Sequence, residues 1–325
     1  GTGRRSRRRG GGLRKLSQAI VPDAELRITE ATELAHAWAQ ALADASHTRI
    51  LAIKGATLSY HGLRRGHVSR DIDVLVEPAG FEAFCAQVEA AGWQARPSTF
   101  LGEHTTTHSI TYFHPQWPVD VDAHRFYPGF LAPADEVFDE LWRRRVTIDF
   151  AHRPCAATDK IAAIAILALH SLRGKRAQGR HLAELDELLT RVTLDDAERA
   201  DLASFAERVD CVEALGVRTD RDVLMALGAV PSGAGDDITR TSPELTEWRG
   251  RVEGTESGAA FWLFAFRQAR WRDRPRMIAR AFWPSRADLL IRDPTLPDLP
   301  GARVRARVAR IGKGLRQVLT SSSGE

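Results

Sequence analysis

At 325 residues, the chain is long enough to form two domains and to bury a sizeable core. Hydrophobic residues make up 43% and charged residues 27% of the sequence, as in ordinary globular proteins, and no apolar run is long enough to span a bilayer. The charged N-terminal stretch is not followed by the hydrophobic segment of a signal peptide. The three cysteines, Cys85, Cys155 and Cys211, form no CxxC pair, which argues against a disulfide framework or a zinc site. A reducing, cytoplasmic location is therefore the default expectation.

The positive charge lies at the two ends of the chain. Residues 1–22 carry seven Lys and Arg residues and residues 302–316 carry six, and neither stretch contains an acid. Without these thirteen positive charges, the formal net charge changes from +4 to −9, so the body of the protein is acidic. We expect the Gly-rich residues 1–22 to be a disordered, solvated tail, with an anionic partner as the alternative. The arginine-rich residues 302–319 predict a basic amphipathic helix that caps the body or docks an acidic partner.

The first half of the chain predicts alternating helices and strands. Apolar spacing and early acids favour a helix over 23–45, and the apolar run 49–55 reads as a strand and turn. The remaining expected elements are a short helix at 56–63, a strand at 71–77, a helix at 80–93 closed by Gly92, and strands at 93–97, 108–115 and 118–126. This order predicts a mixed sheet with flanking helices, of the α+β class.

The second half predicts a mainly helical domain. Residues 158–170 are apolar nearly all round, which indicates a buried helix with Thr158 as its N-cap. Further helices are expected at 179–192, 195–209 and 217–230, then a loop at 231–244, and a helix from 258 up to Pro275. We therefore divide the chain into a tail (1–22), a catalytic domain (23–150), a helical acceptor-binding domain (151–295) and a basic C-terminal segment (296–325).

Two strands carry a repeated pattern of carboxylates. Asp71 and Asp73 alternate with apolar residues, and so do Asp120, Asp122 and His124 some fifty residues later. Alternate residues of a strand face the same side, and two carboxylates that face each other repel unless positive charge lies between them. A single Asp-x-Asp more often marks the solvent end of a strand. Its repetition on a second strand favours a site for a hard divalent cation such as Mg²⁺.

Five segments together resemble a known family. They are "IKGATLSYHG" (53–62), "SRDIDVLVE" (69–77), "VDAH" (121–124), "LALHSLRGKRAQGRHLAELDELL" (167–189) and "FWPSRADLL" (282–290). The chain resembles the nucleotidyltransferase superfamily of the DNA polymerase β type, and more narrowly the bacterial uncharacterised nucleotidyltransferase family. The resemblance runs from about residue 49 to about residue 290 and is most specific at 54–76 and 119–124.

The resemblance implies a metal-dependent transfer of a nucleoside monophosphate from an NTP to an acceptor group, with release of pyrophosphate. Asp71 and Asp73 would hold the metal ion that bridges the triphosphate. Asp122 would hold a second metal ion and help to activate the acceptor hydroxyl. His124 would orient Asp122 or contact substrate. Asp120 would support the metal-binding residues without touching the metal ion itself. The expected cofactor is Mg²⁺, with Mn²⁺ as the alternative.

The nucleotide is expected at the turn after the first strand. There Lys54 and Arg70 would neutralise phosphate charge, and Gly55 would let the backbone approach the phosphates. The superfamily's Gly-Ser turn is replaced here by Gly55-Ala56, so Thr57 or Ser59 would supply the hydroxyl.

The sequence permits two interpretations for several other side chains. His170 is expected to be a buried core histidine, and Asp186 would pair with it or face the acceptor. Lys175, Arg176 and Arg180 are solvated residues or would grip an anionic ligand. The segment "HTTTH" (104–108) is a weak metal candidate.

The sequence leaves more than one possibility for the acceptor and for the activity. The acceptor is a small molecule, a peptide or RNA. The alternatives to the enzyme are a catalytically silent nucleotide- or peptide-binding module and a toxin-like enzyme that modifies tRNA.

Overall fold

The computed structural model describes residues 27–64, 69–97, 108–173, 178–217, 222–230, 242–252, 266, 271–292, 296–297 and 299–321. The predictions for the N-terminal tail, for residues 104–107 and 231–241, and for most of 258–270 lie outside these residues. Among the described helices, none is long and apolar enough to cross a membrane.

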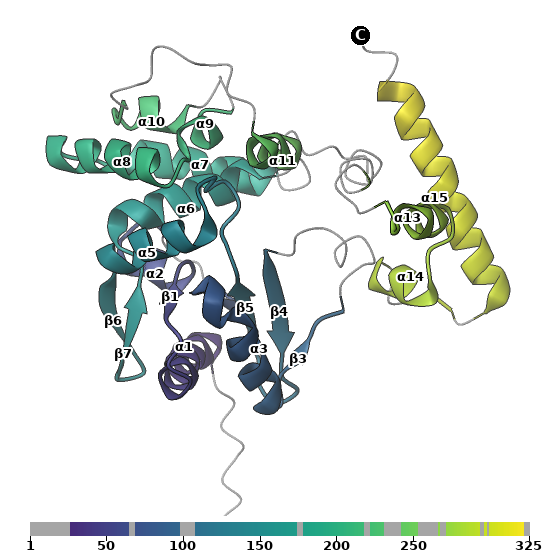
Figure 1. Ribbon diagram of the computed structural model, residues 1–325, viewed down its shortest axis with the longest axis horizontal. Coiled ribbons are helices and arrows are strands. Elements are labelled where there is room, and N and C mark those ends of the chain that lie inside the picture. The colour runs from purple at the N-terminus through teal and green to yellow at the C-terminus, as the bar shows by residue number, and fades with distance from the viewer. Residues whose placement is uncertain are drawn as a thin grey trace, which may run out of the picture.

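A seven-stranded mixed sheet forms the centre of the first half, in the order β3-β4-β5-β2-β1-β7-β6 (Figure 1). The strands are β1 (Ile50–Ala52), β2 (Asp71–Val76), β3 (Gln94–Ala95), β4 (Ser109–Phe113), β5 (Asp120–His124), β6 (Val146–Phe150) and β7 (Arg153–Ala157). The pairs β2–β5 and β1–β7 are parallel, and the other neighbours are antiparallel. The predicted α+β class, with a mixed sheet and flanking helices, is confirmed.

Helices cover both faces of this sheet. The helices of the first half are α1 (Ile28–Ala45), α2 (Ala56–Tyr60), α3 (Phe81–Ala90) and α5 (Ala134–Arg144), with a 3₁₀ turn η1 at Pro78–Gly80. A stripe of small residues on α1 packs with α3 against one face of the central strands. Its members are Ala31, Ala35, Ala39 and Ala43. The opposite face meets α6, so β2 is buried on both sides except at its first residue.

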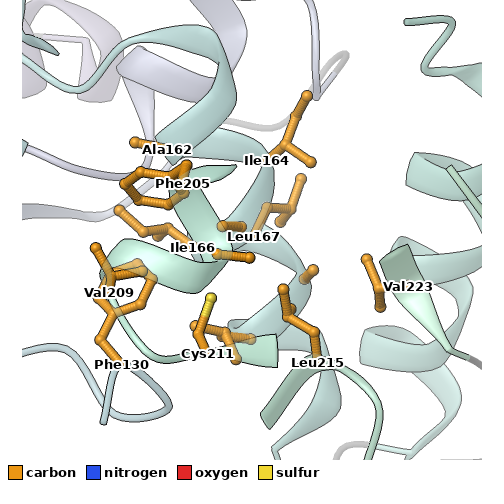
Figure 2. Close-up of a cluster of buried hydrophobic side chains, with 14 of the residues drawn as sticks. Phe130, Ala162, Ile164, Ile166, Leu167, Phe205, Val209, Cys211, Leu215 and Val223 are labelled. Atoms are coloured by element: carbon orange, nitrogen blue, oxygen red, sulfur yellow. The ribbon is translucent and has the colours of Figure 1, made fainter. Parts of the chain in front are cut away.

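The second half is helical, as predicted, and is built around α6. Its helices are α6 (Lys160–Leu172), α7 (Gln178–Arg191), α8 (Asp196–Arg208), α9 (Val212–Leu215), α10 (Val223–Ala226) and α11 (Pro243–Val252). Figure 2 shows apolar side chains of α6 gathered with those of its neighbours, including Ile166, Leu167, Phe205 and Val209. Because the same core cluster includes Leu51 and Leu75 of the sheet, α6 ties the helical half to the sheet.

One loop joins β5 to α5 and lies directly against α6. Gly129 in this loop has a φ of +100°, and a Cβ built there would lie 2.6 Å from Cδ2 of Leu169. Tyr127 in the same loop donates its hydroxyl hydrogen to the Ile166 carbonyl at 3.2 Å. Only glycine satisfies both the backbone angle and the close contact, so the loop is held tightly on α6.

Three sequence predictions are wrong in detail. Asp159, not Thr158, caps α6, because the Asp159 carboxylate accepts the Ala162 N–H at 2.9 Å. The predicted helix 217–230 is helical only at α10 within its described part. Pro275 lies in the first turn of α13, which begins at Arg274, so this proline marks the start of a helix and not its end.

The structure also adds elements that the sequence pattern did not indicate. Among them are α5, α11 and the β6–β7 hairpin, whose last strand carries the sheet to Ala157, past the predicted boundary at residue 150. The division of the chain into four parts stays a prediction.

Three C-terminal helices follow, α13 (Arg274–Phe282), α14 (Arg286–Arg292) and α15 (Pro300–Ser321). The segment before α14 is a capping motif, in which Ser285 and Asp288 exchange side-chain to backbone hydrogen bonds. Arg307 of α15 stacks on Trp283 at 4.6 Å and donates to the Pro284 carbonyl. The predicted basic helix over 302–319 is confirmed.

We predict that truncating the centre of α6 destabilises the whole described core. Leu167 is 1% exposed, so Leu167→Ala should lower the free energy of unfolding by about 2–5 kcal/mol through lost contacts and a cavity. Leu34→Ala is the matched control, because Leu34 on α1 is 39% exposed and its loss should cost less than about 1 kcal/mol. Urea unfolding followed by circular dichroism measures both. Equal losses in the two variants would contradict the central role of α6.

Candidate functional site

The parallel pairing of β2 with β5 brings two carboxylates together. Asp73 lies opposite Asp122 in the register of the two strands. The ligand atoms of Asp73, Asp122 and His124 all lie within 4.8 Å of one another. All three side chains lie on the face of the sheet turned toward α6, since the residues between them pack into the core on the other face.

Asp73 is a buried carboxylate held by two nitrogen donors. Its Oδ1 accepts hydrogen bonds from Lys54 Nζ at 2.5 Å and from His124 Nε2 at 3.0 Å. Burial alone would raise the pKa of Asp73, but the charge of Lys54 and the hydrogen bond from His124 outweigh it and hold the pKa well below its ordinary value of 3.8. The side chain of Asp73 is 4% exposed, so a full negative charge is fixed inside the protein.

His124 bridges the two carboxylates through one nitrogen. Its Nε2 lies 3.0 Å from Asp73 and 3.2 Å from Asp122. An ionised carboxylate can only accept, so Nε2 carries a proton and donates it. Burial would lower the pKa of His124, but the hydrogen bonds to Asp122 and Asp73 raise it above its ordinary value of 6.5. The two carboxylates thus favour the protonated, positively charged form of His124.

Asp122 completes the cluster and is itself oriented from two sides. Its Oδ1 accepts the Thr111 hydroxyl at 3.1 Å, and its Oδ2 accepts from His124. Burial would raise the pKa of Asp122, but the bond from His124 prevails and lowers it. Both carboxylates are thus ionised and held in fixed directions.

The other predicted carboxylates lie apart from this cluster. Asp71 begins β2, and its Oδ1 accepts the Ser69 hydroxyl at 2.5 Å. Asp120 pairs with Arg96 through two hydrogen bonds of 2.7 and 2.8 Å. Neither belongs to the group whose ligand atoms lie within 4.8 Å of one another. The roles predicted for Asp71 and Asp120 stay predictions.

The residues predicted to hold the nucleotide occupy different environments. Lys54 follows β1 and contacts Asp73, and Gly55 precedes α2 with a φ of +57°, which favours glycine. Thr57 is fully buried, and its hydroxyl has no hydrogen-bond partner among the described residues. Ser59 and Arg70 are exposed.

The residues present fit a hard divalent cation. Such ions take oxygen ligands, and Asp73 and Asp122 supply two ionised carboxylates on one face of the sheet. Carboxylates held this close repel unless positive charge lies near them, and here His124 and Lys54 supply it. Asp73 and Asp122 would hold such an ion, and its positive charge would add to that of Lys54 and His124.

The sequence pattern did not indicate a second group of side chains, which lies on α6 and α7 and at segments next to them. Its members are Arg64, His170, Arg173, His181 and Glu184. Only His170 was singled out, as a core histidine, and its ring lies 4.8 Å from that of His181 at close to a right angle. Asp186 is exposed on α7, while Lys175, Arg176 and the side chain of Arg180 lie outside the described residues. A charged side chain every third or fourth residue of a helix was the available signal.

The histidine of the "HTTTH" segment that the structure describes is His108. Its ring lies 5.8 Å from that of His124. Burial, together with the neighbouring charges, lowers the pKa of His108 to about 3, so this imidazole is neutral.

We predict that Lys54 is needed to keep Asp73 charged. Lys54→Met leaves a buried carboxylate with one donor fewer and should lower the free energy of unfolding at pH 7 by about 3–5 kcal/mol. Because the pKa of Asp73 lies below 3.8 in the wild type, its stabilising effect is present above that pH and is lost on acidification. The difference between wild type and variant should therefore narrow as the pH falls below about 4.

The control is Lys160→Met, which removes a pair with Glu198 whose side chains are 37% and 31% exposed and should cost at most about 1 kcal/mol. Urea unfolding between pH 3 and pH 8 measures both variants. A loss for Lys54→Met that does not change with pH would contradict the assignment.

A family model and several solved structures resemble this chain. Residues 13–217 match the sequence profile of the uncharacterised nucleotidyltransferase family, and no curated protein matches the chain. Among solved structures, an antigenic nucleotidyltransferase-like protein from Paracoccidioides brasiliensis is 13% identical, with a TM-score of 0.37, and the match covers 63% of this chain and 95% of that one. The antibiotic-resistance factor ANT(2'')-Ia is 15% identical, with a TM-score of 0.35 and coverage of 58% and 97%.

A third solved structure is MenT4, a nucleotidyltransferase toxin from Mycobacterium tuberculosis H37Rv, which is 14% identical, with a TM-score of 0.32 and coverage of 78% and 93%. The profile match spans well over half of the 325 residues and includes both carboxylate strands. The chain belongs to the uncharacterised nucleotidyltransferase family.

Proposed function

We propose that this protein is a Mg²⁺-dependent nucleotidyltransferase that moves a nucleoside monophosphate from an NTP to an acceptor group and releases pyrophosphate. One observation carries the proposal: the β2–β5 register places two ionised carboxylates, Asp73 and Asp122, side by side within a buried set of cationic donors. Family membership supports nucleotidyl transfer as the reaction. Mn²⁺ would bind the same oxygen ligands.

The side chains of this site have distinct tasks in the proposed reaction. Asp73 and Asp122 bind the divalent cation, and Asp71 at the start of β2 is proposed as a further ligand. When bound, the cation neutralises phosphate charge and lowers the pKa of a coordinated hydroxyl. Lys54 adds positive charge next to the phosphates. His124 holds the two carboxylates in their directions.

The transfer itself requires positioning and charge stabilisation more than covalent chemistry by the protein. The acceptor oxygen attacks the α-phosphorus of the NTP, the bond to the β-phosphate oxygen breaks, and pyrophosphate leaves. Asp122 is proposed to lie beside the acceptor hydroxyl, where it takes up the proton.

The acceptor is proposed to bind between the sheet and the helical half. A cavity of about 750 Å³ opens beside the loop that joins β5 to α5, and α11 forms its other wall. Aromatic residues such as Tyr127 and Trp248 line it, with Glu247 and Arg251 as polar groups. A small molecule, a peptide or a nucleotide at an RNA end fits the class of reaction. An anionic partner for the basic segments at the two ends stays a prediction.

We predict that Asp73→Asn and Asp122→Asn each reduce transfer by about 10²–10³-fold or more, because each removes one charge that stabilises the transition state. The measurement is transfer of label from α-³²P-NTP to total RNA and to a small-molecule extract. Asp71→Asn is expected to act in the same direction. Asp120→Asn is the matched control on the same strand, since Asp120 pairs with Arg96, and it should keep most of the activity. Full activity in both Asp73→Asn and Asp122→Asn would refute the proposal.

A second prediction concerns the metal ion. Chelation with EDTA should abolish transfer, and Mg²⁺ or Mn²⁺ should restore it. Added Mg²⁺ should raise the melting temperature of the wild type, because a ligand that binds only the folded state stabilises it. Asp73→Asn should show little of this shift. A chelator-resistant activity would rule out the metal dependence.

A further inference from the structure

A group of cationic and titratable side chains on α6 and α7 lies next to the carboxylate cluster. Arg173 of the α6 end stacks on the Tyr127 ring at 5.4 Å, and the Tyr127 ring lies 5.9 Å from that of His124. Arg173 Nη2 also donates to His170 Nδ1 at 3.0 Å. Through the Tyr127 ring, this group is therefore connected to His124 of the carboxylate cluster.

Three members of this group, His170, His181 and Glu184, have ligand atoms within 4.8 Å of one another, as a metal site would. Their hydrogen bonding argues against a metal ion. A guanidinium can only donate, so His170 Nδ1 accepts from Arg173 and the ring proton lies on Nε2. Neither nitrogen of His170 then offers a lone pair to a cation. Glu184, the one carboxylate of these three residues, is already paired with Arg64.

The charge of Arg173 has no negative partner in the described part of the chain. Its contacts there are the neutral His170 ring, the Tyr127 hydroxyl at 3.5 Å and the Tyr127 ring face. Burial, with the charges of Lys54 and Arg173, lowers the pKa of His170 far below its ordinary value, so the imidazole is neutral. Both hydrogen bonds use Nη2, so neither of them occupies the Nε and Nη1 donors of this guanidinium.

We propose that Arg173 and His170, with Arg64 at their edge, bind the β- and γ-phosphates of the NTP. This inference rests on the proposed function, because it names the group that holds the polyphosphate end at the same site. The guanidinium supplies a planar donor pair for phosphate oxygens, and His170 supplies its Nε2–H.

The test measures binding, so that it stands apart from transfer activity. Isothermal titration calorimetry with Mg²⁺ present compares inorganic pyrophosphate, the four NTPs and the four nucleoside monophosphates. Arg173→Ala should weaken pyrophosphate and the preferred NTP by about 10- to 100-fold and leave the monophosphate unchanged. Arg173→Lys should recover part of the loss, which separates charge from folding. Arg145→Ala is the matched control, since Arg145 also stacks on an aromatic ring, Trp142, at the far end of α5.

Glu184→Gln distinguishes a phosphate site from a metal site, because it should raise the affinity for phosphate but lower the affinity for a cation. Removing the negative charge frees Arg64, so affinity for pyrophosphate should rise. If the group binds a cation, titration with Zn²⁺ alone should show a wild-type site that Glu184→Gln abolishes, and this result would overturn the proposal. Unchanged pyrophosphate binding in Arg173→Ala, or equal losses for NTP and monophosphate, would also overturn it, as would a wild type that binds neither pyrophosphate nor NTP.

The two proposals can fail separately. Wild-type protein that binds pyrophosphate and NTP through Arg173 but transfers nothing to any acceptor would contradict the proposed function alone. Active protein whose NTP affinity does not depend on Arg173 would contradict this inference alone.

Discussion

The interaction on which the site depends is the buried negative charge of Asp73. A carboxylate deep in a protein is costly unless cations meet it, and Lys54 and His124 both do so. This requirement connects three strands: β2 carries the acid, β5 carries the histidine, and Lys54 follows β1. It also connects them to α6, whose packing on the same face excludes water. The local electrostatics and the order of the sheet are therefore parts of one arrangement.

Much of the fold was predictable because alternation is visible in sequence. The apolar residues between Asp71 and Asp73, and between Asp120 and Asp122, indicated two strands buried on one face, and both exist. The β6–β7 hairpin was not predictable, because its turn residues Ala151 and His152 adopt positive φ without the Gly or Asn that marks such turns.

The site was predictable in composition more than in geometry. Alternation predicted that Asp73, Asp122 and His124 share a face, and only the strand register shows which carboxylates meet. Asp71 faces the same way but lies outside the cluster, because it stands two residues before Asp73 on β2 and pairs with Asp120. Arg173, His181 and Glu184 carry no motif, because they meet only through the packing of α6 against α7 and against Tyr127. The helical spacing of His181 and Glu184 was visible in the sequence, but the contact between the distant segments was not.

The loop glycine at position 129 sets a distance. Sheet-borne groups such as Asp73 and Lys54 stand on one side of the site, and helix-borne groups such as Arg173 on the other. Between them, the loop rests on Leu169, which is fully buried and has little freedom to turn away. A methyl group at position 129 would press on this leucine, so the loop, the leucine or α6 would have to shift. The close packing that glycine permits at position 129 thus helps to set the separation between the two halves of the site.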